Sequence, residues 1–138
     1  MPVKKKIFHT DLLIQVADIN YGGHLGNDRF LTLAQEVRVR WLRSLEWSEL
    51  DIGHSGAGFL VTEAYIKFHN EAFLGELLKA SLYIEDISKC SCRLICELSE
   101  GDKPVGTIDT KLAFFDYQKR KIAKTPTALV DLVENLDE

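Results

Sequence analysis

The longest amphipathic pattern in the chain runs from Asn27 to about Leu45. Its apolar side chains recur at helical spacing and fall within one arc of a helical wheel: Phe30, Leu33, Ala34, Val37, Trp41 and Leu45. Asn27 is placed to cap this helix, and Asp28 beside it suits the positive end of the helix dipole. At about 1.5 Å per residue, the helix would be about 28 Å long and would cross a whole small domain.

Five other stretches have the alternation, or the β-branched and aromatic content, of strands. They cover residues 7–17, 59–68, 77–86, 88–98 and 104–116. The second of them, residues 59–68, has apolar groups on both faces, which is typical of an interior strand packed on a helix. A hairpin turn is expected over residues 99–103, since it contains a glycine.

A short terminal helix is expected after residue 126. Thr125 would be its cap and Pro126 its first helical residue, and the helix would run from Thr127 to about Leu136. The element order is then strand, long helix and four strands, which predicts a single α+β domain over residues 1–138. In this fold an antiparallel five-stranded sheet curls around the helix, and its free edges commonly pair with a second copy.

Composition sets limits on the class of protein. The chain has 138 residues, of which 46% are hydrophobic and 28% charged, and its net charge is -4. This acidic balance argues against general binding of nucleic acid, which requires a basic surface. No apolar run approaches the roughly 18–20 residues of a membrane span, and no apolar stretch of signal-peptide length follows the basic N-terminus. We therefore expect a cytoplasmic protein.

The three cysteines, Cys90, Cys92 and Cys96, are odd in number and close together, so they do not form a disulfide framework. Cys90 and Cys92 lack the second pair that a usual zinc site would need. Their even spacing puts all three on one face of a strand, where we interpret them as reduced packing residues. We expect no metal and no cofactor. The basic run Lys119 to Lys124 is interpreted as a solvated surface turn, with a phosphate site as the alternative.

A polar turn precedes the long helix, and residues 18–27 read Asp-Ile-Asn-Tyr-Gly-Gly-His-Leu-Gly-Asn. Three glycines in five residues, Gly22, Gly23 and Gly26, allow the backbone to approach a ligand closely. Two interpretations stay open for this turn. It is either a structural connection into a core helix, or a ligand turn whose free N–H groups hold an anion or a developing oxyanion.

With this element order, the chain resembles hotdog-fold thioesterases of the 4-hydroxybenzoyl-CoA thioesterase type over nearly its whole length. Such proteins have an Asp-x-Asp-x-x-Gly-His-x-Asn-Asn turn before a central helix that carries a Glu-x-Arg step. The matching segments here are residues 18–27, Glu36-Val37-Arg38, the strand break at 68–77, Phe115-Asp116 and Thr125-Pro126. The resemblance implies the hotdog fold, thioester hydrolysis and a site between two subunits of a homodimer or homotetramer.

Carried over position by position, Asp18 matches the first acidic residue, His24 the histidine and Asn27 the second asparagine of the motif. Asn20 stands where many members have the catalytic carboxylate, and Gly26 stands where the first asparagine usually is. An asparagine can orient a water or a carbonyl, but it cannot act as the usual base or nucleophile. Another carboxylate would then have to serve, or the chain has lost the usual chemistry.

Thioester hydrolysis needs a polarised carbonyl, an activated water or carboxylate, and a dry groove for the acyl chain. The candidate catalytic residues are Asn20, His24, Asp18 and Glu36, and the candidate substrate-binding residues are Gly23, Leu25, Gly26 and Asn27. Each catalytic candidate also has a structural interpretation. His24, Asn20 and Asp18 would stabilise the turn, and Glu36 would either be partly buried with a raised pKa or pair with Arg40 at i+4. Glu63 and Glu71 are further carboxylate candidates.

The predicted function is hydrolysis of an acyl-CoA or acyl-carrier thioester to free acid and thiol. The alternative is a non-catalytic hotdog protein that binds acyl thioesters, because Asn20 replaces the acid. A hotdog dehydratase or hydratase shares the fold but matches the turn and the helix less well. The sequence leaves three points open: the identity of the acyl chain, whether the thiol belongs to CoA or to a carrier protein, and whether the basic turn contacts CoA.

Overall fold

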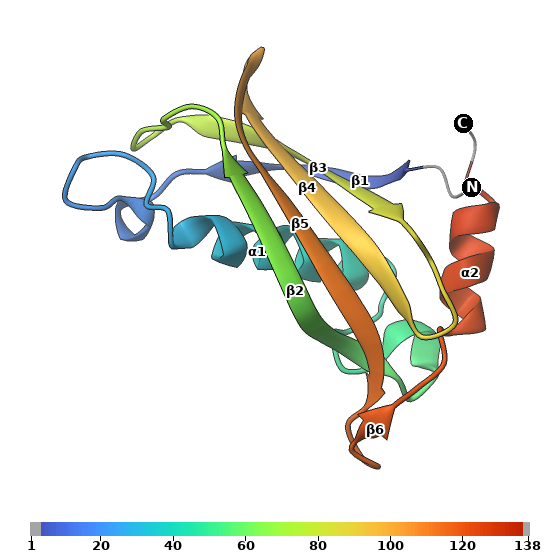
Figure 1. Cartoon of the computed structure of the whole chain (residues 1–138). Coiled ribbons are helices and arrows are strands. Elements are labelled where there is room, and N and C mark those ends of the chain that lie inside the picture. The colour runs from blue at the N-terminus through green and yellow to red at the C-terminus, as the bar shows by residue number, and fades with distance from the viewer. Residues whose placement is uncertain (1–3, 137–138) are drawn as a thin grey trace.

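The computed structural model describes residues 4–136, so the first three residues of the basic N-terminal segment lie outside the described part. The described residues form two α-helices, two 3-10 helices and six strands. Figure 1 shows their arrangement. In order they are β1 (Lys5–Leu13), η1 (Val16–Asp18), α1 (Arg29–Ser44), η2 (Ile52–His54), β2 (Gly58–Phe68), β3 (Leu77–Glu85), β4 (Ser91–Glu100), β5 (Lys103–Asp116), β6 (Lys121–Ile122) and α2 (Thr127–Glu134). Neither α1 nor α2, within this described part, is long and apolar enough to cross a membrane.

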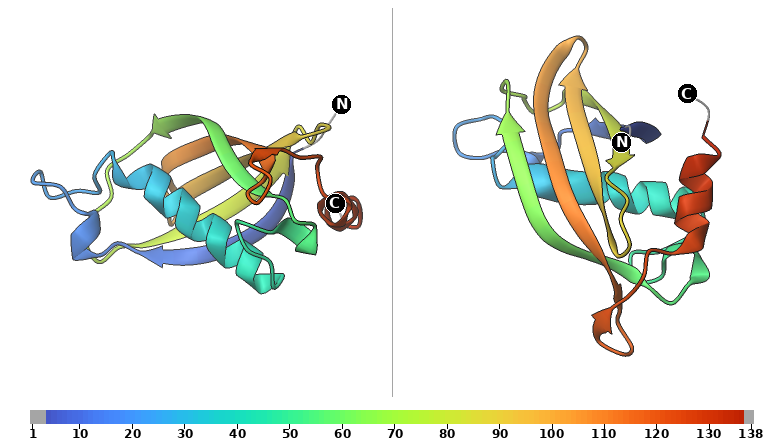
Figure 2. Two further views of the ribbon diagram at one scale, coloured as in Figure 1. Left: turned by 90° about the horizontal axis from the view of Figure 1, so that it is seen from below. Right: turned by 45° about the vertical axis from the view of Figure 1, so that its right-hand side comes forward.

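The main strands form one antiparallel sheet in the order β1-β3-β4-β5-β2, and β6 pairs with β5. The sheet curls around α1, which lies along its concave face (Figure 2). This is the arrangement that the hotdog resemblance implies, and the α+β prediction with one long central helix and a short C-terminal helix is confirmed. The two edges of the sheet are β1 and β2.

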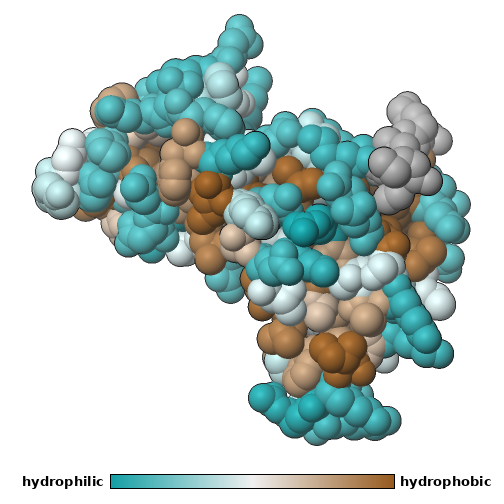
Figure 3. Space-filling model, viewed as in Figure 1, coloured by the Kyte–Doolittle hydropathy of each residue, from teal (hydrophilic) through white to brown (hydrophobic). Residues whose placement is uncertain are grey.

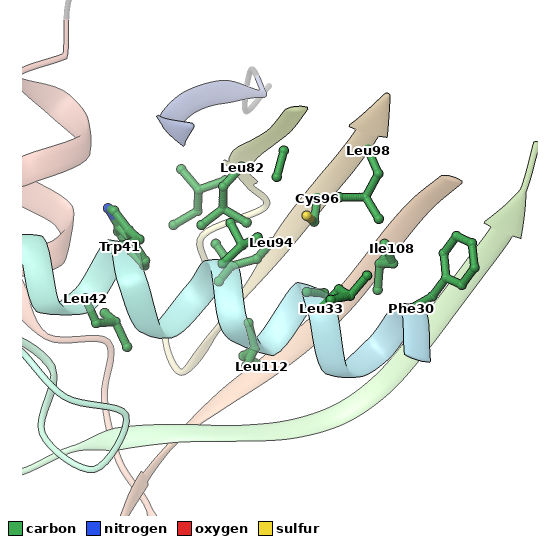
Figure 4. Packing of buried hydrophobic residues seen from close by; sticks show 14 of the residues in the cluster. Phe30, Leu33, Trp41, Leu42, Leu82, Leu94, Cys96, Leu98, Ile108 and Leu112 are labelled. Atoms are coloured by element: carbon green, nitrogen blue, oxygen red, sulfur yellow. The ribbon is translucent and has the colours of Figure 1, made fainter. Parts of the chain in front are cut away.

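The core lies between α1 and the concave face of the sheet. Val37, Trp41 and Leu42 of α1 are almost completely buried, and Phe30 and Leu33 extend the same stripe toward the start of the helix (Figure 4). The sheet side of this core includes Leu82, Leu94, Cys96, Ile108 and Leu112. Burying each large side chain of this kind contributes about 1.5–3 kcal/mol.

One charged side chain of α1 is also buried. Arg38 is 6% exposed and lies against the apolar groups of β3, β4 and β5. Its Nε donates to Oε2 of Glu49, and its Nη2 donates to Oε1 of the same residue at 3.4 Å. A buried guanidinium is tolerated only when a carboxylate compensates its lost hydration, so Glu49 fixes the segment after α1 to the helix.

The cap residues of both helices differ from the sequence prediction, although α2 begins at Thr127 as predicted. Helix α1 begins at Arg29 with Asp28 as its N-cap residue, and no side chain caps it. Asn27 was therefore wrong as the cap, because the Arg29 N–H already bonds the Gly26 carbonyl and keeps Asn27 within the preceding turn. At α2 the N-cap position is Pro126, not Thr125. The Thr125 hydroxyl instead donates to the Ser88 carbonyl at 2.7 Å.

The prediction of residues 59–68 as an interior strand is wrong. Strand β2 is the last strand of the sheet, and most of its residues are exposed, including Val61, Tyr65 and Phe68. Apolar groups on both faces therefore do not mark burial in this chain. They mark a sheet edge that carries exposed apolar side chains.

Smaller differences concern strand ends. The first strand ends at Leu13, because the 3-10 turn of η1 follows, with the Gln15 N–H bonded to Asp18 Oδ2 at 2.9 Å. Strand β4 begins at Ser91, so Cys90 precedes it and does not share the strand face. Cys92 and Cys96 are buried, and all three cysteines are free thiols. The predicted five-residue hairpin turn is shorter, because β4 and β5 extend to Glu100 and Lys103.

Candidate functional site

The turn before α1 is closed by its own hydrogen bonds. The Asn20 N–H donates to the His24 carbonyl at 3.0 Å, and the Gly23 N–H donates to the Asn20 carbonyl at 3.0 Å. The Asn20 side-chain oxygen accepts from the Gly22 N–H at 2.8 Å. Gly23 has a φ of 84°, which an L-residue rarely adopts. Asn20 thus makes the turn-stabilising bond that an asparagine at this position offers.

His24 is held at the end of this turn with one ring nitrogen free. Its Nδ1 lies 3.1 Å from the Leu25 carbonyl oxygen, and because a carbonyl only accepts, Nδ1 is the donor. Within residues 4–136, Nε2 has no hydrogen-bond partner. The Leu25 N–H donates to the Ala72 carbonyl at 2.8 Å, so the segment after β2 lies directly beside the turn. A neutral His24 therefore has a lone pair on Nε2 that can accept a proton.

A cavity of about 210 Å³ lies between this turn, the start of α1 and the end of β2; we call it the His24 pocket. Its apolar wall is Leu25, Phe30 and Phe68, with the two phenyl rings edge to face at 4.9 Å between centroids. Its polar lining comprises His24, Asn27, His69, Asn70 and Glu71. The pocket therefore combines an aromatic wall with two imidazoles and a carboxylate.

The side chains from the end of β2 differ in how they are held. His69 Nε2 lies 3.1 Å from the Thr107 hydroxyl, and the Asn70 amide donates to the Pro104 carbonyl at 2.7 Å. The Glu71 carboxylate has no hydrogen-bond or ion-pair partner among the described residues. Glu71 is thus the one carboxylate in the lining, and nothing within the described chain competes for it.

Two backbone donors lie at the start of α1, one at Asn27, which lines the pocket, and one at Asp28, which follows it in the chain. Among the described residues, the N–H groups of Asn27 and Asp28 have no acceptor. They precede the first residue of α1, where the helix dipole is positive. Such donors favour an anionic oxygen, whether of a bound anion or of a carbonyl that gains charge during a reaction.

A family model for the thioesterase-like superfamily matches residues 14–133 of this chain. The chain belongs to the thioesterase-like superfamily. The matched region contains the turn, α1, every strand after it and most of α2. No curated protein sequence shows a significant match to the chain.

Solved structures show the same fold at low sequence identity. A 1,4-dihydroxy-2-naphthoyl-CoA thioesterase from Synechocystis is 23% identical, covers 95% of this chain and 98% of its own, and gives a TM-score of 0.82. A putative thioesterase from Pseudomonas aeruginosa is 16% identical with 94% and 99% coverage and the same TM-score of 0.82. A Staphylococcus aureus protein solved in complex with CoA is 16% identical with 96% and 84% coverage and a TM-score of 0.81.

In this thioesterase-like protein, Asp18 and Glu36 lie outside the His24 pocket. Both line a separate groove of about 360 Å³ between α1 and the end of β1. Asp18 is 6% exposed, and its Oδ1 accepts from Arg29 Nε at 3.2 Å. Of the two interpretations of Glu36, partial burial is wrong, because its side chain is 51% exposed and pairs with Arg40 Nε at 2.7 Å. The i+4 ion pair, the structural interpretation of Glu36, is what the structure contains.

Some of the other predicted site residues line the His24 pocket, and others support the turn beside it. Leu25 and Asn27 line the His24 pocket, whereas Gly23 and Gly26 belong to the turn behind it. Glu63 lies on β2 with its Oε1 3.6 Å from Arg93 Nη2, outside this lining.

Glu71 was among the carboxylate candidates from the sequence, but His69, Asn70 and the two phenylalanines of the pocket were not predicted to belong to the site. The available signal was the polar His-Asn-Glu run directly after a strand that ends in phenylalanine. Within residues 4–136 no group of three or more His, Cys, Asp or Glu side chains is placed to hold a metal ion.

Proposed function

We propose that this protein hydrolyses an acyl-CoA thioester in the His24 pocket. The observation that carries the proposal is the meeting, in one cavity, of a histidine with a free Nε2, an uncommitted carboxylate and an aromatic wall. Membership of the thioesterase-like superfamily supports the reaction class. The CoA complex of the Staphylococcus aureus protein and the CoA-thioester activity in the name of the Synechocystis protein support CoA as the thiol.

The first step is attack of water on the thioester carbonyl. The acyl group packs against Phe30 and Phe68, and the carbonyl oxygen accepts from the N–H groups of Asn27 and Asp28. His24 Nε2 takes a proton from the water as its oxygen bonds to the carbonyl carbon. Negative charge then develops on the carbonyl oxygen, where the backbone donors and the helix dipole stabilise it.

In the second step the tetrahedral intermediate collapses to the free acid, and its carbon–sulfur bond breaks. The proton held by His24 passes to the departing sulfur and releases the thiol, so the ring returns to its neutral state. The Glu71 carboxylate stabilises the imidazolium between the two steps through its negative charge. Asn20 does not act as an acid or a base in this scheme. It supports the turn, because its side-chain oxygen accepts the Gly22 N–H.

We further propose that the active form is a homodimer joined along the free edge of β2. Strand β2 has 11 residues and pairs only with β5 in the described chain. Its exposed Val61, Tyr65 and Phe68 would be covered by a second copy, and its outer backbone groups would gain partners. The three free thiols fit a reducing compartment, which supports the cytoplasm as the location.

The second candidate function is binding of an acyl thioester without hydrolysis. The observation in its favour is that Asn20 replaces the acid of the family motif and that its side-chain oxygen is already bonded to the Gly22 N–H. In that case the pocket would hold the thioester and leave it intact.

A thiol-release assay over short, long and aromatic acyl-CoA substrates separates the two functions. Turnover by the wild-type protein that falls sharply in Glu71→Gln supports the proposed reaction. Acyl-CoA binding without turnover supports the second function. Activity that is gained only in Asn20→Asp would mean that this chain has lost the usual catalytic group and does not use Glu71.

A further inference from the structure

A second cavity lies on the outer face of the sheet, the face that points away from α1. Its volume is about 420 Å³, against about 210 Å³ for the His24 pocket, and we call it the outer cavity. Its lining includes Ile95 of β4 and Thr107 and Asp109 of β5. These three side chains point outward, because side chains alternate along a strand and the neighbouring Cys96 and Ile108 belong to the core.

The outer cavity has an apolar part. Ile95 is 7% exposed and Tyr65 of β2 is 67% exposed, so the isoleucine forms the base and the phenol ring stands beside it. Both residues are register partners of Asp109, which places all three in one row across β4, β5 and β2. An exposed ring beside an apolar base offers a stacking surface for a planar apolar group.

The outer face is open to a ligand. Figure 1 views it with β2, β5 and β4 in front of α1, and Figure 3 shows hydrophobic residues among the hydrophilic ones on the same side. A second copy paired along the edge of β2 would extend the sheet in its own plane. Such a copy covers the edge of the Tyr65 ring and leaves the outer face of the ring accessible.

A cation, a hydroxyl and an imidazole lie together at one end of the outer cavity. Lys67 of β2 and Thr107 of β5 are direct register partners, so their Cβ atoms are about 4.5–5.5 Å apart. His69 Nε2 lies 3.1 Å from the Thr107 hydroxyl oxygen. When Nε2 carries the ring proton and donates it to this oxygen, the hydroxyl proton of Thr107 is left for another acceptor. A carboxylate matches the ammonium group and this hydroxyl.

The nearest acids on the outer face already have cations. Asp109 Oδ1 accepts from Arg93 Nη1 at 3.0 Å. Glu97 of β4 forms an ion pair with Lys4 at 3.0 Å, and Lys4 lines the cavity. These pairs reduce the repulsion that Asp109 and Glu97 would exert on an anion bound nearby.

The remaining acids lie farther from Lys67. Glu85 of β3, which also lines the cavity, is separated from it by β4 and β5, or about 14 Å at about 4.8 Å per strand. Glu63 and Asp86 face Arg93 at 3.6 and 3.7 Å, outside the lining. Within residues 4–136, the Lys67 ammonium has no hydrogen-bond or ion-pair partner.

We infer that the outer cavity binds an aromatic carboxylate, and that the bound acid acts on the His24 pocket through His69. The ring of the acid lies against Tyr65 and Ile95, and its carboxylate lies between Lys67 and Thr107. His69 lines both cavities, so an acid that restrains its imidazole changes the wall of the His24 pocket. The second part of the inference rests on the proposed function, because hydrolysis of a thioester with an aromatic acyl group releases an acid of this class.

The first test locates the binding of 2-naphthoate by NMR titration of the whole chain. We expect the N–H signals of Lys67, Ile95 and Thr107 to shift. Lys67→Gln should raise the Kd about fivefold at low salt, because it removes the cation and keeps a side chain of similar length. The control Lys79→Gln changes a lysine on the same face of β3, outside the outer cavity, and should keep the wild-type Kd.

Two further probes separate the charge from the ring. Octanoate keeps the carboxylate without the ring, and 2-naphthylmethanol keeps the ring without the charge, so both should bind about fivefold or more weakly than 2-naphthoate. Equal Kd values in the two lysine variants, or shifts confined to the His24 pocket, would overturn the inference. A tetramer by sedimentation whose outer-cavity signals ignore 2-naphthoate would also overturn it, since further copies would then cover this face.

The second test measures the coupling between the two cavities. Saturating 2-naphthoate should lower kcat for thiol release from acyl-CoA about fivefold. Lys67→Gln should keep the basal kcat and need about fivefold more acid for the same effect, in line with its Kd. An acid that raises KM alone, and equally in wild type and Lys67→Gln, competes within the His24 pocket and would overturn the coupling.

The two proposals fail in different ways. A wild-type protein that releases no thiol from any acyl-CoA, yet shows the expected shifts with 2-naphthoate, contradicts hydrolysis and supports the outer cavity as a carboxylate site. A protein that turns over acyl-CoA while 2-naphthoate leaves the signals of Lys67, Ile95 and Thr107 unchanged supports hydrolysis and excludes this site.

Discussion

Asp18 and Arg29 form an ion pair that closes the turn before α1, with Arg29 Nη2 3.1 Å from Asp18 Oδ1. The Asp18 side chain is 8% exposed and the Arg29 side chain 33%. The other carboxylate oxygen, Oδ2, accepts the Gln15 N–H at 2.9 Å. Asp18 therefore connects η1 to the first residue of α1, and the intervening turn carries Asn20 and His24.

Removing the Asp18 carboxylate should destabilise the fold more than removing the exposed carboxylate of Asp28. We expect Asp18→Ala to lower the free energy of unfolding by about 2–4 kcal/mol, because the Gln15 N–H and the Arg29 guanidinium lose their acceptor. Asp28→Ala, the control at the N-cap position without a side-chain bond, should cost less than about 1 kcal/mol. Urea denaturation measures both, and equal losses would contradict a structural role for Asp18.

His24 should be required for turnover and dispensable for folding. We expect His24→Gln to lower kcat by about 100-fold or more, because the proposed reaction uses the free Nε2 of His24 as its general base. His9→Gln, at an exposed position on β1, is the matched control and should keep the wild-type kcat. If both variants turn over acyl-CoA at the wild-type rate, the base lies elsewhere.

Glu49 should contribute strongly to stability through Arg38. We expect Glu49→Ala to cost about 3–5 kcal/mol, since it leaves the buried guanidinium of Arg38 without a carboxylate. The control is Glu36→Ala, which breaks the exposed ion pair to Arg40 on the same helix and should cost less than about 0.5 kcal/mol. Thermal unfolding followed by circular dichroism compares them, and similar melting temperatures would exclude a stabilising buried pair.

The three cysteine thiols should differ in their reactivity toward a thiol reagent. Burial raises the pKa of Cys92 and that of Cys96 to about 12, so at pH 8 only about one in 10⁴ of either would be thiolate. We expect a thiol reagent to modify Cys90 alone in the folded protein and all three after denaturation. Cys90→Ser should abolish the fast phase, and rapid modification of three thiols in the native protein would contradict the burial of Cys92 and Cys96.

Gly106 should determine the position of the pocket wall. A Cβ at Gly106 would overlap the Phe30 ring and lie 3.1 Å from the Lys67 carbonyl oxygen. We expect Gly106→Ala to cost about 1–3 kcal/mol and to change the acyl-chain preference, because Phe30 must move within the His24 pocket. Adding Phe30→Leu makes room for the methyl group and should restore part of the stability. A Gly106→Ala protein with wild-type stability and chain preference would show that this contact is unimportant.

Sequence reasoning found the architecture because the relevant signals are local. The apolar stripe of α1 repeats with the period of a helix, and the strands show their own alternation, so each element could be predicted from its own residues. The turn motif around His24 indicated the superfamily. Errors arose where a signal is ambiguous within a few residues, as at Asn27 and Thr125, whose polar side chains fit a cap or a turn equally well.

Local patterns in the sequence were enough to predict a long helix, five main strands and a thioesterase-like turn, because period and motif are properties of neighbouring residues. The tertiary structure was needed to show that β2 is an edge, that Asp18 pairs with Arg29, and that Glu71 lines the same pocket as His24. These relationships join residues that are distant in sequence. They depend on the order of the strands in the sheet and on the path of the chain between them, so the spacing of neighbouring residues does not reveal them. The site therefore depends on how the sheet closes around α1, which brings the end of β2 to the turn.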